Sequence, residues 1–219
     1  MKRALLIVAL MLFAVSAFAD TTYNTYAGYN PYWHPFGYPD TSTYGETFTA
    51  PSNGDHFLNT FSLYMGGPYA SGDIVLGAYI ATWDGSKAGT LLWSSGAIDY
   101  QNTGEAQLSF NTGGLNLTGG GSYIVFLSVS EFYGQSSGQS YIDGGNGGCP
   151  GCAFAYFNNE GNFGELFTNS WDASGLQPDF AFTADFSSSG GQVPEPGTLA
   201  LLGTGLITAV GVVRRRRNW

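Results

Sequence analysis

The sequence predicts an all-β protein built around a β-sandwich of the jelly-roll type. Apolar and polar residues alternate along several stretches with the two-residue period of a strand. Clusters of Gly, Asn, Asp and Pro, which favour turns, separate these stretches. Glycine makes up 33 of the 219 residues and charged residues only 11%. Ordinary domains have about a quarter charged residues, so this composition argues against a long helical bundle.

The strand pattern is clearest at residues 57–65, 74–81, 122–130 and 180–186. In the first, second and fourth stretches apolar residues recur at every other position, so each has one face for the core. The third is a continuous run of β-branched and aromatic residues, as expected of a central strand. Shorter strands are expected at residues 47–49, 91–94, 98–100, 107–110 and 153–157. This predicts about nine or ten strands and no helix in the central part of the chain.

The overall composition excludes two classes of protein. Hydrophobic residues make up 43% and aromatic residues 16% of the chain, which is enough apolar surface to form a core and argues against a disordered chain. The 16 carboxylates exceed the seven Lys and Arg residues, and the pI is near 4.3. Such a balance lacks the positive surface that nucleic-acid binding requires, so no nucleic-acid partner is predicted.

The N-terminus has the three parts of a secretory signal peptide. Two basic residues follow Met1, an apolar stretch covers residues 4–15, and an A-x-A site is formed by Ala17 and Ala19. The apolar stretch is shorter than the roughly 17–25 residues of a membrane span. We therefore predict a signal peptide at residues 1–19, cleaved after Ala19.

The C-terminus carries a second, tripartite signal. A V-P-E-P box precedes 17 uncharged residues at 197–213, which are followed by an arginine cluster. The uncharged run is long enough for a membrane helix, and the arginines are expected on the cytoplasmic side. The residues of the box and the cluster are Val193, Pro194, Glu195, Pro196, Arg214, Arg215, Arg216 and Arg217.

Residues 193–217 resemble the PEP-CTERM sorting signal of Gram-negative bacteria, with the box, the transmembrane helix and the arginine cluster in the same order. The resemblance implies that an exosortase, an integral membrane cysteine transpeptidase, cleaves at or near the box. It also implies passage through the cytoplasmic membrane to the cell surface or the extracellular matrix. The prolines favour an extended, helix-resistant segment that an enzyme can bind. An uncut type I membrane anchor is the alternative.

Between these ends we predict three parts. Residues 20–45 form an aromatic, Gly- and Pro-rich segment, residues 46–186 the β-sandwich, and residues 187–192 a flexible Ser/Gly linker. Lys87 is the only basic residue of this central region, which holds all but one of the 16 carboxylates. Its surface is therefore compatible with divalent cations and neutral sugars.

Two cysteines, Cys149 and Cys152, form a C-x-x-C pair in an exported chain, which favours a structural disulfide. A redox role requires a helix N-terminus, and the pair follows a glycine-rich stretch instead. Zinc would need further ligands, and the two histidines, His34 and His56, lie far away in the sequence. No metal-ligating residue is predicted.

Ser136 lies in a G-x-S-x-G sequence at residues 134–138. In serine hydrolases of that pattern the serine sits between a strand and a helix, and the histidine follows it in the chain. Both histidines here precede Ser136, so the match is attributed to chance and no catalytic residue is predicted. A glycosidase needs only two carboxylates, and the sequence does not select a pair.

Oxygen ligands for calcium occur in residues 143–146 and 83–85, but without the spacing of an EF-hand loop, so ordinary turns are preferred. No cofactor is predicted, and calcium binding by these residues is the alternative. Aromatic rings offer platforms for sugars, and the candidates are Trp33, Trp83, Trp93 and Trp171.

We predict an exported surface or extracellular-matrix protein, such as a biofilm component, with a noncatalytic structural or adhesive role and an association with polysaccharide. The alternatives are a secreted carbohydrate-active enzyme and an uncut membrane-anchored binding protein. The predicted partners are the exosortase, the cytoplasmic membrane during sorting, and extracellular polysaccharide.

Overall fold

The computed structural model describes residues 20–146, 148–173 and 179–190, which belong to one compact unit. Within these ranges the chain is all-β, with two short 3₁₀ helices and no α-helix. The strands are β1 (Thr21–Asn24), β2 (Tyr26–Phe36), β3 (Thr43–Thr49), β4 (Phe57–Ala70), β5 (Ile74–Trp83), β6 (Ala88–Ser94), β7 (Ile98–Tyr100), β8 (Glu105–Asn116), β9 (Ser122–Ser128), β10 (Gln139–Gly145), β11 (Ala153–Phe157), β12 (Asp179–Phe180) and β13 (Phe182–Ser187). The 3₁₀ helices are η1 (Ser130–Phe132) and η2 (Phe163–Phe167).

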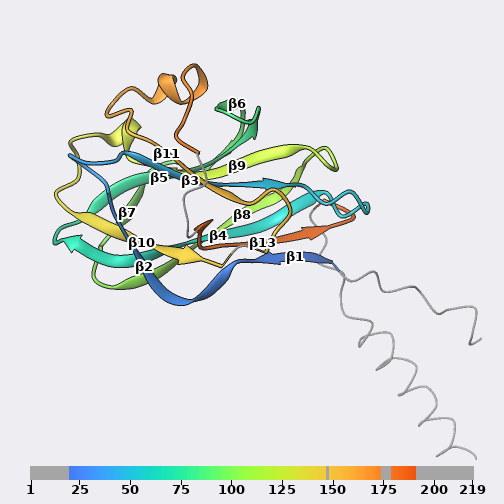
Figure 1. The fold of residues 1–219 in the computed structure, drawn as a ribbon, viewed down its shortest axis with the longest axis horizontal. Coiled ribbons are helices and arrows are strands. Elements are labelled where there is room, and N and C mark those ends of the chain that lie inside the picture. The colour runs from blue at the N-terminus through green and yellow to red at the C-terminus, as the bar shows by residue number, and fades with distance from the viewer. Residues whose placement is uncertain (1–19, 147, 174–178, 191–219) are drawn as a thin grey trace, which may run out of the picture. The chain divides into compact units, whose positions relative to one another are not determined.

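The strands form two antiparallel sheets (Figure 1). In the first, sheet A, β4 pairs with β8 along one edge and with β13 and β10, placed end to end, along the other. On their far side β13 and β10 pair with β1 and β2, and β12 pairs with the end of β10. Sheet B has the order β11-β3-β9-β5, and β6 and β7 share the remaining edge of β5.

The main hydrophobic core combines the inward faces of both sheets. Phe182 and Phe186 of sheet A pack against Phe48 of sheet B, with ring centroids 5.6 and 5.9 Å apart. These contacts follow from the period-two pattern, because Phe182, Ala184 and Phe186 of β13 are all buried on one face.

β4 departs from the predicted pattern at its start. A register shift between Leu58 and Thr60 places Leu58, and not its neighbour Phe57, in the core. Beyond this irregularity Phe61 and the following alternate residues point inward, as the sequence predicts. A bulge of this kind inserts a residue and reverses which side chains face the core.

Two segments without a strand period are also strands. β1 and β2 occupy residues that we assigned to a separate segment at 20–45, so the sandwich begins before the predicted boundary at residue 46. β10 includes Gly144 and Gly145, which we assigned to a loop. A Cβ atom added to Gly145 would lie 2.7 Å from the side-chain oxygen of Thr25. Glycine therefore permits the close approach of the chain between β1 and β2 to β10.

Residues 158–173, which follow β11, form a cap, a partial third layer on the outer face of sheet B, above β11 in Figure 1. Trp171 and Leu166 from this segment are buried in a second hydrophobic cluster with Ile124 and Phe126 of β9. This cap explains why β9 is apolar on both faces. The outer face of sheet A instead carries exposed polar side chains along β8.

Several predicted features lie outside the described residues: the signal peptide at 1–19 with Ala17 and Ala19, the end of the 187–192 linker, the box at 193–196, the apolar run at 197–213 and the arginine cluster at 214–217. Within the described ranges, no helix has the length and apolar character needed to span a membrane.

Candidate functional site

A polar groove crosses the outer face of sheet A. It is a cavity of about 340 Å³ over β4, β8 and β13, the three strands whose alternate residues point away from the core. Strand alternation explains its polarity, because the opposite residues of the same strands supply the apolar core. The residues of this polar groove are Thr60, Ser62, Gln107, Ser109, Phe110, Asn111, Thr183 and Asp185.

Hydrogen bonds hold these side chains in place. The hydroxyls of Ser62 and Ser109 lie 2.9 Å apart, and the Gln107 amide donates to Ser62 at 3.0 Å. Asp185 accepts hydrogen bonds from Thr60 at 2.8 Å and from Thr22 at 3.0 Å. The groove therefore presents fixed hydroxyl and amide groups that both donate and accept.

A second cavity, of about 200 Å³, shares Gln107 with the polar groove and extends it toward β2 and β10. It is lined by the acid–tyrosine cluster, which we define as Tyr26, Tyr64, Glu105 and Asp143. The rings of Tyr26 and Tyr64 stack with centroids 4.0 Å apart and an interplanar angle of 7°. Asp143 comes from β10 and Glu105 from β8, so pairing of both strands with β4 brings them to one cavity.

Asp143 is only 1% exposed, and its Oδ1 atom has no hydrogen-bond partner among the described residues. Burial, followed by the nearby negative charge of Glu105, raises the pKa of Asp143 to about 6, against a smaller opposing effect of the Asn30 backbone N–H. Gly66 leaves room for this carboxylate, because a Cβ atom there would lie 3.0 Å from Oδ1. The cluster therefore contains a buried acid, and no basic side chain of the described residues is paired with it.

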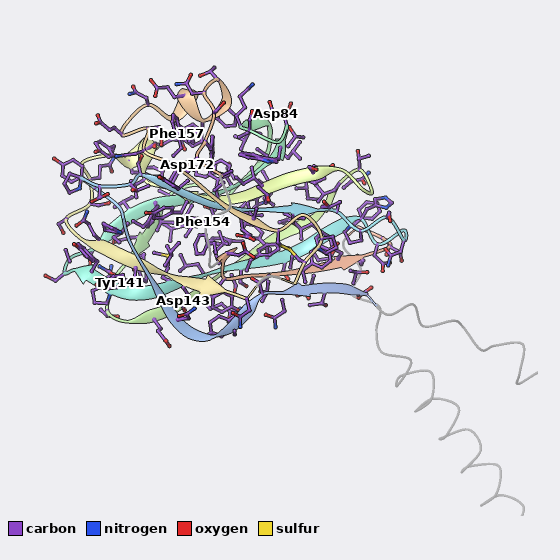
Figure 2. All side chains as sticks on the ribbon, in the orientation of Figure 1. Asp84, Tyr141, Asp143, Phe154, Phe157 and Asp172 are labelled. Atoms are coloured by element: carbon purple, nitrogen blue, oxygen red, sulfur yellow. A yellow bond between two sulfur atoms is a disulfide. The ribbon has the colours of Figure 1, made fainter. Side chains whose placement is uncertain are left out.

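The aromatic rings of Tyr69 and Tyr141 continue the same face beyond Gly66. Tyr141 lies two residues before Asp143 on β10, so both side chains belong to one face (Figure 2). Its ring packs edge-on against Tyr69, which is 51% exposed, at 5.3 Å. The outer face of sheet A thus combines a polar groove, two carboxylates and accessible tyrosines.

The predicted tryptophan platforms lie elsewhere. Trp93 packs against Phe61 and Phe110 at the main core, and Trp83 packs edge-on against the buried Trp171. The side chain of Trp33 is not among those described. Sequence reasoning considered tryptophans and missed the tyrosines. The polar residues at every other position from Glu105 to Asn111 were the available signal for this face.

The two stretches considered for calcium have different structures: residues 83–85 include the expected turn, whereas Asp143 lies in a strand. Asp84 accepts hydrogen bonds from the backbone N–H groups of Ser86 and Lys87 and forms a 3.1 Å ion pair with the Lys87 ammonium. These hydrogen bonds, led by that from Lys87, lower the pKa of Asp84 well below its usual range. Asp84 therefore stabilises a turn. Asp143 lies in strand β10, and its cavity partner Glu105 comes from a distant part of the sequence.

Ser136 of the G-x-S-x-G sequence is buried, and its hydroxyl accepts a 2.8 Å hydrogen bond from the backbone N–H of Val75. His56 stacks on Phe57, with ring centroids 5.0 Å apart. Ser136 thus ties the segment before β10 to β5, and its observed contacts are those of a structural residue.

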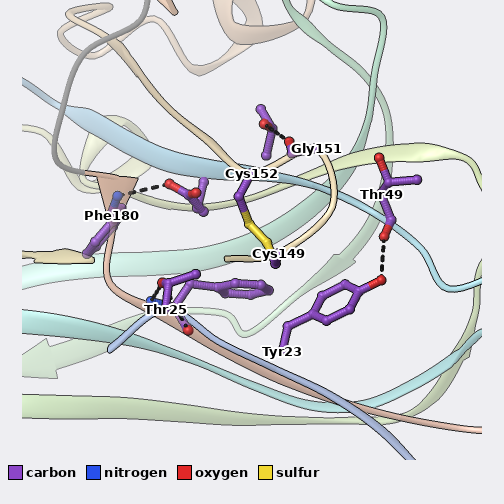
Figure 3. Close-up of a disulfide and its surroundings, with 10 residues drawn as sticks. Tyr23, Thr25, Thr49, Cys149, Gly151, Cys152 and Phe180 are labelled. Atoms are coloured by element: carbon purple, nitrogen blue, oxygen red, sulfur yellow. Dashed lines mark hydrogen bonds between the residues drawn. A yellow bond between two sulfur atoms is a disulfide. The ribbon is translucent and has the colours of Figure 1, made fainter. Parts of the chain in front are cut away.

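Cys149 and Cys152 are joined by a disulfide in the turn between β10 and β11 (Figure 3). The same turn is bound to the end of β3, because Thr47 donates its hydroxyl to the Gly151 carbonyl at 2.7 Å and the Thr49 N–H donates to the Pro150 carbonyl at 2.7 Å. Both half-cystines also pack against the main core. The disulfide therefore supports a tight connection between the sheets.

Comparison with known proteins identifies the C-terminal signal. Residues 192–217 match the model of the PEP-CTERM protein-sorting motif. The chain therefore carries an exosortase sorting signal, which implies an exported protein that is sorted through the membrane to the cell surface. No curated protein matches the chain.

Two solved structures are similar in fold. One contains the cysteine protease and lectin-like domains of Cwp84, a surface layer associated protein of Clostridium difficile, with 12% identity and a TM-score of 0.47. The other is the clostridial cysteine protease Cwp84 after propeptide cleavage, with 14% identity and a TM-score of 0.49. Each match covers 78% of this chain, and 36% and 40% of those chains, respectively.

Proposed function

We propose that this exported surface protein is a noncatalytic, adhesive component of the extracellular matrix that binds neutral polysaccharide along the outer face of sheet A. The observation that carries the proposal is the polar groove, a hollow lined by hydrogen-bonded hydroxyl and amide groups on a solvent-facing sheet. A protein at the cell surface would meet extracellular polymer, which supports a binding role for this solvent-facing sheet.

The chemistry of the groove favours sugars over other ligands. A sugar hydroxyl donates and accepts hydrogen bonds, as do Ser109 and Gln107, so the two sets of groups are complementary. The adjoining tyrosines supply flat apolar surface for the C–H face of a pyranose. The carboxylates of Asp185 and Glu105 would repel acidic polymers, so a neutral polysaccharide fits better than an anionic one.

The shape of the site favours a polymer over a monosaccharide. The polar groove and the second cavity are contiguous through Gln107 and together extend across β13, β4, β8 and the β2–β10 pair. A ligand that follows this path contacts the polar groups first and the tyrosines at its far end. An extended chain of several sugar units satisfies both regions at once.

Replacing Ser109 by tyrosine is expected to weaken polysaccharide binding at least about tenfold, equivalent to 1.4 kcal/mol. Ser109 is exposed in the middle of the polar groove, so a large side chain fills the groove without disturbing the core. The measurement is affinity electrophoresis of the full chain in mild detergent, in gels that contain dextran, galactomannan, mixed-linkage β-glucan or alginate.

The matched control is Ser94→Tyr, because Ser94 is exposed on β6 of the other sheet. It should leave retardation by the neutral polymer unchanged. Equal effects of both substitutions, or retardation by alginate alone, would contradict the proposal.

A glycosidase is the second candidate, because Asp143 and Glu105 line one cavity and Asp143 has a pKa raised to about 6. A protonated acid beside a second carboxylate is the arrangement of glycoside hydrolysis. Release of reducing ends from the bound polymer, lost in Glu105→Gln, would establish the enzyme and reject the noncatalytic role. Binding without release supports our first proposal.

The jelly-roll connectivity also belongs to the proposal, and strand order supports it. We count as one row either a single strand or two strands that lie end to end in a sheet. In chain order the eight rows are β1 with β2, β3, β4, β5, β6 with β7, β8, β9, and β10 with β13, and β11 is an additional strand beside β3. Sheet A contains the first, eighth, third and sixth rows in that spatial order, and sheet B the second, seventh, fourth and fifth. This is the order of two interleaved Greek keys. An experimental structure with another row order would refute it.

Maturation at both ends is the final part of the proposal. We expect the surface form to begin at Asp20 and to lack residues 214–217, because the signal peptide and the sorting signal are removed. Intact-mass spectrometry of protein from the cell surface and from the cytoplasmic membrane measures both ends. A surface form that retains the arginine cluster would instead support the uncut membrane anchor.

A further inference from the structure

We infer that the acid–tyrosine cluster is a binding site for a hard divalent cation, with Ca²⁺ held between the carboxylates of Asp143 and Glu105. This site uses the second cavity, at the end of the proposed polysaccharide path. It does not require that polysaccharide binds.

The first observation is the state of Asp143. Its side chain is 1% exposed, lines the cavity, and has an oxygen, Oδ1, without a hydrogen-bond partner among the described residues. Buried carboxylate oxygens are normally paired, because an unpaired one loses its hydration without compensation. An ion in the cavity would supply the missing partner.

The second observation is the local charge. Glu105 lines the same cavity and acts on Asp143 as a like charge, which favours neutralisation by a cation. Lys87, the only basic residue between residues 20 and 190, is paired with Asp84 in the turn between β5 and β6. No side-chain ammonium or guanidinium of the described residues therefore balances the pair.

The third observation is the kind of donor. The cavity is lined by two carboxylates, the side-chain amide of Gln107 and the tyrosines Tyr26 and Tyr64. These provide oxygen donors, which suit Ca²⁺ or Mg²⁺ and not the nitrogen- and sulfur-binding metals. The volume of about 200 Å³ also leaves room for water molecules to complete the coordination.

The donors come from four strands that meet at this point. Tyr26 belongs to β2, Tyr64 to β4, Glu105 to β8 and Asp143 to β10. A bound cation would therefore connect β8 and β10, which pair with opposite edges of β4. It would also hold in place the side chains at this end of the polysaccharide path. It would also occupy the carboxylates that a glycosidase needs, so the cation site and the enzymatic alternative exclude each other.

The test uses the full chain in mild detergent, treated with a chelator and without polysaccharide. CaCl₂ is titrated into the protein in an isothermal calorimeter, and thermal unfolding is measured with and without CaCl₂. We expect one equivalent of Ca²⁺ with a Kd on the order of 10⁻⁴–10⁻³ M, as in extracellular calcium modules. Calcium should raise the melting temperature of the wild-type protein.

Asp143→Asn and Glu105→Gln should each weaken Ca²⁺ binding at least tenfold and remove the calcium-dependent rise in melting temperature. Glu105 is exposed, so its variant tests the site even if Asp143→Asn folds poorly. The matched control is Asp99→Asn, which removes one carboxylate from an exposed position on β7. It should bind Ca²⁺ like the wild-type protein.

No saturable binding, or an equal loss in Asp99→Asn, would overturn the site and indicate attraction to the acidic surface alone. Ser109→Tyr separates the two proposals, because it blocks the polar groove and leaves the cluster intact. Retained Ca²⁺ binding by a chain that binds no polysaccharide would reject the proposed function and support the cation site.

Discussion

Replacing Trp171 by alanine is expected to lower the free energy of unfolding by about 3–5 kcal/mol. Trp171 is 5% exposed, and its ring packs edge-on against Phe126 at 5.3 Å and Trp83 at 5.8 Å. Its indole N–H donates to the Leu166 carbonyl at 2.9 Å. The substitution therefore removes a buried aromatic contact between the cap and sheet B and leaves the Leu166 carbonyl without the indole donor.

Urea unfolding followed by far-UV circular dichroism measures this loss, and the near-UV signal reports whether the pair of tryptophans is still packed. The control is Leu91→Ala, since Leu91 is 41% exposed on the neighbouring β6. It should change stability by less than about 0.5 kcal/mol. A loss below about 1 kcal/mol for Trp171→Ala would show that the cap contributes little to the fold.

Replacing Glu46 by glutamine is expected to stabilise the protein at pH 7 by on the order of 1–3 kcal/mol. Glu46 is completely buried in β3. One carboxylate oxygen accepts a hydrogen bond from the Phe180 N–H at 2.9 Å, and the other has no hydrogen-bond partner among the described residues. Glutamine keeps a carbonyl acceptor for Phe180 and replaces the ionisable carboxyl group with an amide that stays neutral.

The effect should depend on pH in a defined direction. Burial, and next the neighbouring carboxylate of Asp179, raise the pKa of Glu46 well above its ordinary value of 4.5. Above pH 4.5 the unfolded chain releases a proton that the folded protein retains, so the wild-type protein loses stability as pH rises toward the folded pKa. The advantage of Glu46→Gln should therefore grow with pH and disappear below about pH 4.5.

Unfolding free energies of the two proteins between pH 4 and pH 8 measure this difference. Glu160→Gln is the control, because Glu160 is exposed, and it should stay within about 0.5 kcal/mol of the wild-type protein throughout. An advantage of Glu46→Gln that is constant with pH would show that the charge of Glu46 is not its cause.

The sequence predicts the strands whose side chains alternate. β13 and the second half of β4 have the expected buried faces, and β9 is covered on both sides as its continuous apolar run indicates. β10 was missed because its glycines resemble a loop. Gly145 is explained by the close approach of Thr25, a contact between residues that are far apart in the sequence.

The candidate site was predicted less well than the fold. Tyr26 and Tyr64 stack only because β2 and β4 both pair with β10, and no local spacing encodes that contact. The unpartnered oxygen of Asp143 likewise depends on tertiary burial. The sequence gives the chemical character of the outer face, through alternate polar residues on β8, whereas its groove requires the assembled sheet.

The ion pair between Lys87 and Asp84 has a consequence for the lifetime of the protein outside the cell. Trypsin-like proteases cleave after Lys or Arg, and Lys87 is the only such residue between residues 20 and 190. Its side chain is held at 3.1 Å by Asp84 within a hydrogen-bonded turn. A trypsin-like protease therefore finds a single, constrained cleavage site between residues 20 and 190. Peptide mapping with trypsin would likewise divide this part of the chain into only two very long fragments.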